Sequence, residues 1–378
     1  MSESVRRARL PSGKSTLLTD EVDKVEAVGR RVHAPRLLLH AGLVLLSLWL
    51  FVIALQLIKG GAVGLRPVLD AVSADGIAGH LGFGWFGSYV VLSGSPVAAV
   101  AMSLFAGGTT TDIETFAMIN GTRMGASLIV LVAGFVSYVT GRRNPDGLYV
   151  GVVALLTAFT LWGPAMPLGL LILDQGWLDG VRISSPGALT SIVGTVSDPV
   201  VDPLADLLPE IGIFLAGVGM LVLAFTAFDR AIPSLETPGP RFEALSRLLH
   251  RRIAMFAFGS LVTLITLSVS LSVTILVPLA LKGYVRRDHV VPYVMGANIA
   301  TWIDTLFAAL LLDSPEAFTI VLTEMVVGGA VSLVVLLLLY EPYTRLILGV
   351  AHRVSSSRNH LAAFIGALFI MPLVLLIP

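Results

Sequence analysis

The segment VVPYVMGANIATWIDTLFAALLL, Val290–Leu312, has the length and apolar content of a membrane-spanning helix. A crossing takes about 20 apolar residues, because the hydrocarbon core is about 30 Å thick and a helix rises about 1.5 Å per residue. The segment nevertheless contains Gly296, Asn298, Thr301 and Asp304, which places a carboxylate near the middle of the bilayer. An ionisable group at that depth costs about 2.5 kcal/mol or more. The segment therefore predicts a membrane protein with a polar site at this place.

The composition of the whole chain agrees with a membrane protein. Of its 378 residues, 55% are hydrophobic and 13% are charged, and the mean hydropathy is +0.87. These values are too apolar for a soluble domain and are typical of a polytopic, all-α membrane protein. The net charge of zero gives no reason to expect a nucleic-acid partner. The absence of cysteine excludes thiolate metal sites and cysteine nucleophiles, and because the sequence contains no recognisable catalytic motif we expect neither an enzyme nor a cofactor.

Apolar stretches along the chain predict seven continuous spans and two interrupted ones. The continuous spans are Leu37–Ile58, Thr122–Thr140, Leu148–Leu173, Leu208–Phe228, Val290–Leu312, Ala317–Tyr340 and Leu361–Ile377. One interrupted region, residues 83–119, is broken by SGSP and AGGTTTD, and the other, residues 253–281, is broken by SVSLSVT and Pro278.

Positive charge predicts the orientation of these spans. Of the 25 Lys and Arg residues, 21 lie in five segments: the N-terminal arm, Arg142–Arg143, Arg230–Arg252, Lys282–Arg287 and Arg345–Arg358. By the positive-inside rule these segments are cytoplasmic. The loop Asp174–Glu210 instead has six acidic residues and a single Arg, which indicates the external side. We therefore expect a multi-pass protein of the plasma membrane with a cytoplasmic N-terminus.

This orientation predicts two re-entrant helical hairpins that enter from opposite sides. Residues 83–119 must begin and end outside, whereas residues 253–281 must begin and end inside, as in the inverted repeats of secondary transporters. The alternative is that both regions are ordinary helical pairs kinked at Gly and Pro. The predicted parts are a cytoplasmic N-terminal arm (1–36), a first half (37–228) containing hairpin 83–119, a cytoplasmic amphipathic linker (229–252), and a second half (253–378) containing hairpin 253–281.

The second hairpin and the segment after it, SVSLSVTILVPLALKGYVRRDHVVPYVMGANIAT, resemble the second repeat of the sodium-dependent phosphate cotransporter family. Members of that family have a Ser/Thr-rich turn followed about thirty residues later by GANIGT. Here Gly296–Thr301, GANIAT, is similar to the later element. In the first half, SPVAAVAMSLFAGGTTTD looks like the first hairpin, with Thr109–Thr111 at the serine positions, and INGTRMGAS resembles a contracted second element.

The resemblance implies two inverted repeats and sodium-coupled phosphate uptake across the plasma membrane. Three features depart from the family pattern. Both turns lack the signature Gln, and Trp302 and Asp304 replace small or hydroxyl residues. The fold tolerates such changes more easily than the choice of substrate does.

Candidate binding residues fall into two groups, because Na⁺ needs oxygen ligands and phosphate needs N–H and hydroxyl donors. The first group is Thr109, Thr110, Thr111, Asp112, Glu114, Asn120, Thr122 and Arg123. The hydroxyls before Asp112 also fit a plain helix N-cap. Arg123 is open to two interpretations: it binds an anionic substrate, or it pairs with Asp112, Glu114 or Glu324.

The second group is Ser268, Ser270, Ser272, Thr274, Asn298, Thr301, Asp304 and Glu324. The three serines at period two do not share a helical face, which favours an unwound turn, although bonding back to the preceding helical turn is the alternative. Asp112 and Asp304 are the candidate Na⁺ ligands, and Asp304 and Glu324 are intramembrane acids.

These features predict a secondary active transporter that carries phosphate with Na⁺ by alternating access. Its expected partners are the lipid bilayer and a small anionic solute, and a homodimer is compatible with the sequence. One alternative is a transporter of the same fold that carries another small solute or uses H⁺. A further alternative is a channel or a non-transporting membrane scaffold.

Overall fold

The computed structural model describes residues 14–71, 76–140, 146–231, 251–269, 271–274, 276 and 285–377, and every element among them is helical. The helices of the first half are α1 (Lys14–Gly61), η1 (Ala62–Leu65), α2 (Arg66–Ala71), α3 (Gly76–Val91), α4 (Gly94–Ala106), α5 (Asp112–Ala126), α6 (Leu128–Thr140), α7 (Asp146–Asp174), α8 (Gly187–Leu207) and α9 (Glu210–Ala231). Those of the second half are α11 (Arg252–Thr266), α13 (Arg287–Ala300), α14 (Trp302–Leu311), α15 (Pro315–Leu338), α16 (Tyr340–Ser356) and α17 (Arg358–Leu375). The expected all-α fold is confirmed.

Within the described residues, seven helical segments are long and apolar enough to cross a membrane. They are Leu38–Leu65, Asp112–Val132, Gly147–Asp174, Glu210–Ala231, Arg287–Leu311, Pro315–Leu338 and Arg358–Leu375. Each overlaps one predicted span. The start of the second segment differs most from the prediction. It lies at Asp112, ten residues before the predicted Thr122, because the polar first turns of α5 are helical as well.

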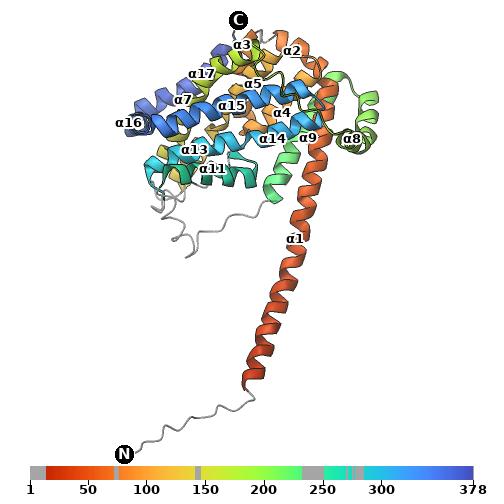
Figure 1. Ribbon diagram of the computed structural model, residues 1–378, viewed down its shortest axis with the longest axis vertical. Helices are drawn as coiled ribbons and strands as arrows, with labels where there is room; N and C mark the ends of the chain where they lie inside the picture. Colours follow the sequence, from red (N-terminus) through yellow and green to blue (C-terminus); the bar gives the residue numbers. More distant parts are fainter. Residues whose placement is uncertain are drawn as a thin grey trace, which may run out of the picture.

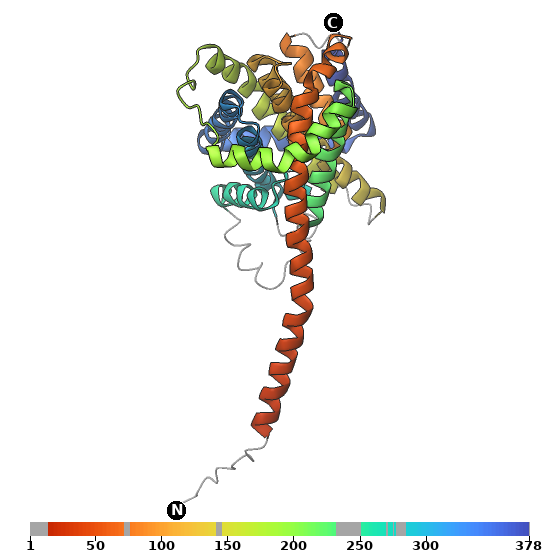
Figure 2. The ribbon, with the colours of Figure 1, turned by 90° about the vertical axis from the view of Figure 1, so that its right-hand side faces the viewer.

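Helix α1 is long, and its C-terminal part packs against α9 (Figure 1). A Cβ added at Gly61 would overlap the backbone of Phe214, and one at Gly217 would overlap that of Ile58, so α1 and α9 run antiparallel in very close contact. The N-terminal part of α1 extends well beyond the helical bundle in both views (Figures 1 and 2). Of the predicted arm and linker, residues 1–13 and 232–250 lie outside the described residues.

Two further helix pairs approach each other through glycines. In the pair α3–α5, Gly84 faces the backbone of Met118 and Gly121 faces that of Leu81. The pair α11–α13 repeats this arrangement, with Gly259 against Tyr293 and Gly296 against Phe256. Each of these four residues lies 175 positions after its counterpart in the first pair. The absence of a side chain is what permits each contact, because the facing atoms belong to backbone.

The turns that follow α3 and α11 are also alike. Leu92, directly after α3, has a φ of 55°, and Leu267, directly after α11, has a φ of 48°; these two leucines are again 175 positions apart. A serine follows each of them. Positive φ costs a non-glycine residue about 1–2 kcal/mol, so each leucine is held there by its surroundings. The turn between α3 and α4 lies here, and Thr109–Thr111 lie in the next turn, between α4 and α5.

The glycine contacts generate a stability prediction. Gly84→Ala and Gly259→Ala should each lower the free energy of unfolding by about 1–3 kcal/mol, because the added methyl group forces two backbones apart. Gly219→Ala is the matched control on α9, because nothing lies within 4 Å of its Cβ position. The measurement is thermal unfolding of the detergent-purified variants followed by circular dichroism. Equal melting temperatures for Gly84→Ala and Gly219→Ala would contradict the packing described.

Candidate functional site

Four helices bring a buried cluster of polar and aromatic side chains together. Helix α5 contributes Asn120 and Arg123, α7 contributes Trp162, α14 contributes Trp302 and Asp304, and α15 contributes Glu324. Arg123 lies in the last turn of α5, and Asp304 lies in the first turn of α14. A cation at a helix C-terminus and an anion at a helix N-terminus both interact favourably with the helix dipole. We call these six residues the Arg123 cluster.

The guanidinium of Arg123 is stacked on an indole ring. Its Cζ atom lies 3.9 Å from the centre of the Trp302 ring, and the residue is 1% exposed. Nε and Nη2 of Arg123 are buried without a hydrogen-bond partner. The stacking stabilises a cation by about 0.5–2 kcal/mol, whereas removing an ion from water costs several kcal/mol. The indole therefore offsets only part of the desolvation, and the free N–H groups can bind an anion.

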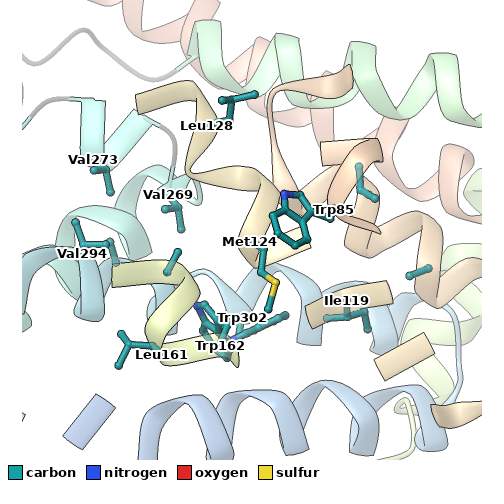
Figure 3. Close-up of a cluster of buried hydrophobic side chains, with 14 of the residues drawn as sticks. Trp85, Ile119, Met124, Leu128, Leu161, Trp162, Val269, Val273, Val294 and Trp302 are labelled. Carbon is teal, nitrogen blue, oxygen red and sulfur yellow. The ribbon is translucent and has the colours of Figure 1, made fainter. Parts of the chain in front are cut away.

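Trp302 packs against Trp162. Figure 3 shows both tryptophans and Met124 in one buried cluster. The two indole rings are 5.5 Å apart at 78°, an edge-to-face arrangement. Gly328 on α15 leaves the space for Trp162, because a Cβ there would overlap the indole. The ring nitrogens of both tryptophans are buried without a partner. Sequence reasoning noted Trp302 only as a departure from a family pattern and missed Trp162, for which the sequence holds no local signal.

Glu324 is completely buried. Its Oε2 accepts a hydrogen bond of 3.4 Å from Nδ2 of Asn120, which is also 3.4 Å from the carbonyl oxygen of Trp162. These contacts are long for hydrogen bonds. Oε1 of Glu324 and Oδ1 of Asn120 have no partner. Each carboxylate oxygen normally accepts more than one hydrogen bond, so Glu324 has unused capacity for a cation or a donor.

Asp304 connects the cluster to a cavity. Its Oδ1 accepts a hydrogen bond of 2.9 Å from Oγ1 of Thr305, and the hydroxyl of Ser95 in α4 also interacts with the carboxylate. Oδ2 is buried without a partner. The residue lines a cavity of about 230 Å³ between α1, α9, α14 and Leu267. The other lining residues are Ser47, Leu48, Phe51, Ala224, Phe225, Phe228, Ile303 and Phe307.

The charges of the cluster interact without forming close ion pairs. Both Asp304 and Glu324 interact electrostatically with Arg123. Arg182 pairs with Glu316 at 3.3 Å and Arg286 pairs with Asp288 at 3.1 Å, whereas neither carboxylate of the cluster lies within 4.0 Å of the Arg123 nitrogens. The cluster therefore contains one cation and two carboxylates, and each of the three charged groups has at least one buried atom free for another partner.

Asn298, near the end of α13, and Thr301, between α13 and α14, add unused polar groups. Both are 1% exposed, and neither the amide of Asn298 nor the hydroxyl of Thr301 has a partner. Thr301 is the residue at which α13 ends and α14 begins. Of the second candidate group, Asn298, Thr301 and Glu324 are thus buried with unsatisfied polar atoms, and Asp304 is partly buried with one unsatisfied carboxylate oxygen.

The threonines and acids before α5 form a helix cap. Thr111 and Glu114 make a reciprocal capping box, and the Asp112 carboxylate accepts a hydrogen bond from the N–H of Ile113. Thr110 bonds to the Thr115 hydroxyl at 2.8 Å. The N-cap interpretation is confirmed for Thr111.

The expected pairing of Arg123 with Asp112 or Glu114 is wrong. These acids begin α5 and Arg123 ends it, and eleven helical residues span about 16 Å. For the same reason Asp112 and Asp304 do not share a cation site. Thr122, the neighbour of Arg123, donates to the carbonyl of Ile119, and Thr109 has a buried hydroxyl without a partner.

The serines after α11 lie around the turn rather than in the Arg123 cluster. Ser268 accepts a hydrogen bond from the N–H of Leu271, and Ser272 bonds to the Tyr293 hydroxyl at 2.9 Å. Ser270 lies outside the described residues. Ser268 and Thr274 line a second cavity, of about 290 Å³, together with Ser93, Ser95 and Asp229. Ser93 and Ser95 belong to the SGSP break, which the sequence indicated only as an interruption of an apolar region.

No three His, Cys, Asp or Glu side chains come together as metal ligands among the described residues. Comparisons with protein families, with curated proteins and with solved structures gave no match. The interpretation of the site therefore depends on its chemistry.

A substitution of Gly328 tests how Trp162 and Trp302 pack. Gly328→Ala should displace Trp162, and with it the Trp302 ring under Arg123, whereas Gly329→Ala should have no such effect because its Cβ position is open. We expect Gly328→Ala to lower the free energy of unfolding by about 1–3 kcal/mol and to shift the tryptophan emission of the folded protein. An unchanged emission spectrum in Gly328→Ala, matching that of Gly329→Ala, would contradict this packing.

Proposed function

We propose that the protein is a secondary active transporter that carries a small anionic solute, with inorganic phosphate as the first candidate and Na⁺ as the coupling ion. The observation that carries this proposal is the buried Arg123 guanidinium, with two free N–H groups, beside two carboxylates that each have a free oxygen. Ionisable groups inside the membrane are expensive and mark solute or ion pathways. In this proposal, a bound solute or ion supplies the missing partners of these charged groups.

The repeated helix contacts support an alternating-access mechanism. Glycine contacts and positive-φ leucines recur at a constant spacing of 175 residues, which is the signature expected of an internal repeat. Combined with the charge distribution, this spacing favours two inverted repeats, with α3–α4 entering from outside and α11 with the segment after it entering from inside. Serines from both turns line the same 290 Å³ cavity, as expected if the two hairpins meet.

The charge balance of the Arg123 cluster supports coupling to cations. One Arg and two carboxylates give a net charge of −1, and a phosphate monoanion would bring it to −2. Like charges in a site of low dielectric repel strongly. Bound Na⁺ at Asp304 or Glu324 offsets this repulsion, so the solute and the cation would enter together.

A specific observation favours the alternative of H⁺ coupling or of a different solute. Glu324 is completely buried, and its one hydrogen bond is long. A carboxylate in such surroundings can carry a proton as readily as it binds Na⁺. A channel or a scaffold would instead show gradient-independent flux or no flux.

The test is uptake of ³²P-phosphate into proteoliposomes under an inward Na⁺ gradient, an inward proton gradient, or neither. We expect accumulation with the Na⁺ gradient, and its absence under all three conditions would refute phosphate transport. Arg123→Gln, Asp304→Asn and Glu324→Gln should each reduce the rate by at least about tenfold, or about 1.4 kcal/mol. Arg345→Gln and Asp202→Asn, which change exposed residues, are the matched controls.

The orientation has its own test, because the chain contains no cysteine and single-cysteine variants label without background. In intact cells, a membrane-impermeant maleimide should label the Asp202→Cys variant on α8. The Arg353→Cys variant on α16 should react only after permeabilisation. The reverse pattern would place the N-terminus outside and would invert the proposed orientation.

A further inference from the structure

We infer that the preferred solute is a small oxyanion that also carries an amino group, such as an aminoalkylphosphonate or an amino acid. The inference rests on the proposed function for the route that this solute takes across the membrane. It concerns the charges that the Arg123 cluster leaves unpaired, which are of both signs.

The anionic half of such a solute fits the free edge of Arg123. Nε and Nη2 lie on the same edge of the guanidinium, and both lack partners. Two parallel N–H groups match two oxygens of a phosphonate or a carboxylate. Trp302, 3.9 Å from Cζ, covers one face of the guanidinium and fixes its plane, so the Nε–Nη2 edge is the part whose hydrogen-bonding capacity is unused.

The cationic half fits the two carboxylates. Oδ2 of Asp304 and Oε1 of Glu324 are buried without partners, as is Oδ1 of Asn120 beside Glu324. A primary ammonium carries three N–H donors, which can satisfy several acceptor oxygens at once. Both carboxylates interact electrostatically with Arg123, yet neither lies within ion-pair distance of it, so the charges are close neighbours that remain unpaired.

Charge balance favours a zwitterion over a simple anion. A monoanion pairs with Arg123 and leaves both carboxylates unpaired, so two cations are needed to neutralise the cluster. A simple amine brings the net charge to zero, but it pairs with only one carboxylate and leaves both Arg123 and the other carboxylate without a partner. An amino-substituted oxyanion pairs with Arg123 and one carboxylate, and leaves the other carboxylate for one coupling ion. Each unpaired buried charge is costly. The zwitterion leaves one charged group of the cluster unpaired, whereas the monoanion and the amine each leave two.

The direct test is calorimetric binding to the full-length protein in detergent, in Na⁺ buffer, with five probes. These are 2-aminoethylphosphonate, its amine-free match ethylphosphonate, β-alanine, its amine-free match propionate, and ethylamine. We expect 2-aminoethylphosphonate or β-alanine to bind at least tenfold more tightly than its amine-free match and than ethylamine. Whichever of the two binds more tightly identifies the oxyanion as a phosphonate or a carboxylate.

Variants separate the two halves of the site. Asp304→Asn or Glu324→Gln should reduce the tenfold preference for the amino compound to less than threefold, while binding of the amine-free match persists. Arg123→Gln should abolish binding of both oxyanions. Arg123→Lys, which keeps the charge and loses the parallel N–H pair, should restore weak binding. Thermal unfolding of each variant identifies any loss of binding that results from misfolding.

Equal affinity for an amino compound and its amine-free match would overturn the inference, as would the absence of binding by all five probes. Different results would refute the proposed transport function. Binding of 2-aminoethylphosphonate or β-alanine without gradient-driven accumulation in proteoliposomes would refute transport and leave the binding preference standing. Na⁺-driven phosphate uptake that neither amino compound inhibits would refute the inference and leave transport standing.

Discussion

The arrangement of the protein interior depends on how the desolvated guanidinium of Arg123 is stabilised. Arg123 is buried at 1% exposure, and a tryptophan ring replaces the solvent on one of its faces. The ring is positioned by a second tryptophan from α7, and that tryptophan fits because α15 has a glycine opposite it. One buried charge thus determines side chains on four helices. Since stacking offsets only part of the desolvation, two N–H groups of Arg123 remain without a partner.

Breaks in two helices place the charges of the cluster at helix ends. Helix α5 gives way to α6 at Ser127, a few residues after Arg123, and α13 gives way to α14 at Thr301, just before Trp302 and Asp304. The C-terminal dipole of α5 favours the cation, and the N-terminal dipole of α14 favours the anion. The apolar surroundings raise the free-energy cost of burying these charges. Their positions at helix ends lower that cost.

The sequence predicted well those features that depend on the bilayer. A span needs about 20 apolar residues, so the seven crossing segments could be located from composition alone. Arg123, Asn298, Asp304 and Glu324 were identified for the same reason, because polar groups in apolar stretches are conspicuous. What could not be predicted was their neighbourhood. Trp162 is an ordinary residue of an apolar helix, and only the tertiary packing brings it to Trp302. The threonines before α5 could not be assigned to one role, because a hydroxyl-rich run looks the same in a helix cap and in a binding turn.

Helix α4 has a consequence for the order in which the protein assembles. Residues Gly94–Leu104 are buried along their whole length, and the helix has 13 residues, about 20 Å, which is too short to cross the hydrocarbon core. Its neighbours include α1 and α5, but also α9 and α14, the last of which begins about 200 residues later in the chain. During synthesis α4 thus leaves the ribosome long before its final surroundings exist. The packing around α4 is therefore complete only once α14 has been synthesised, so the final structure of the first half depends on the second.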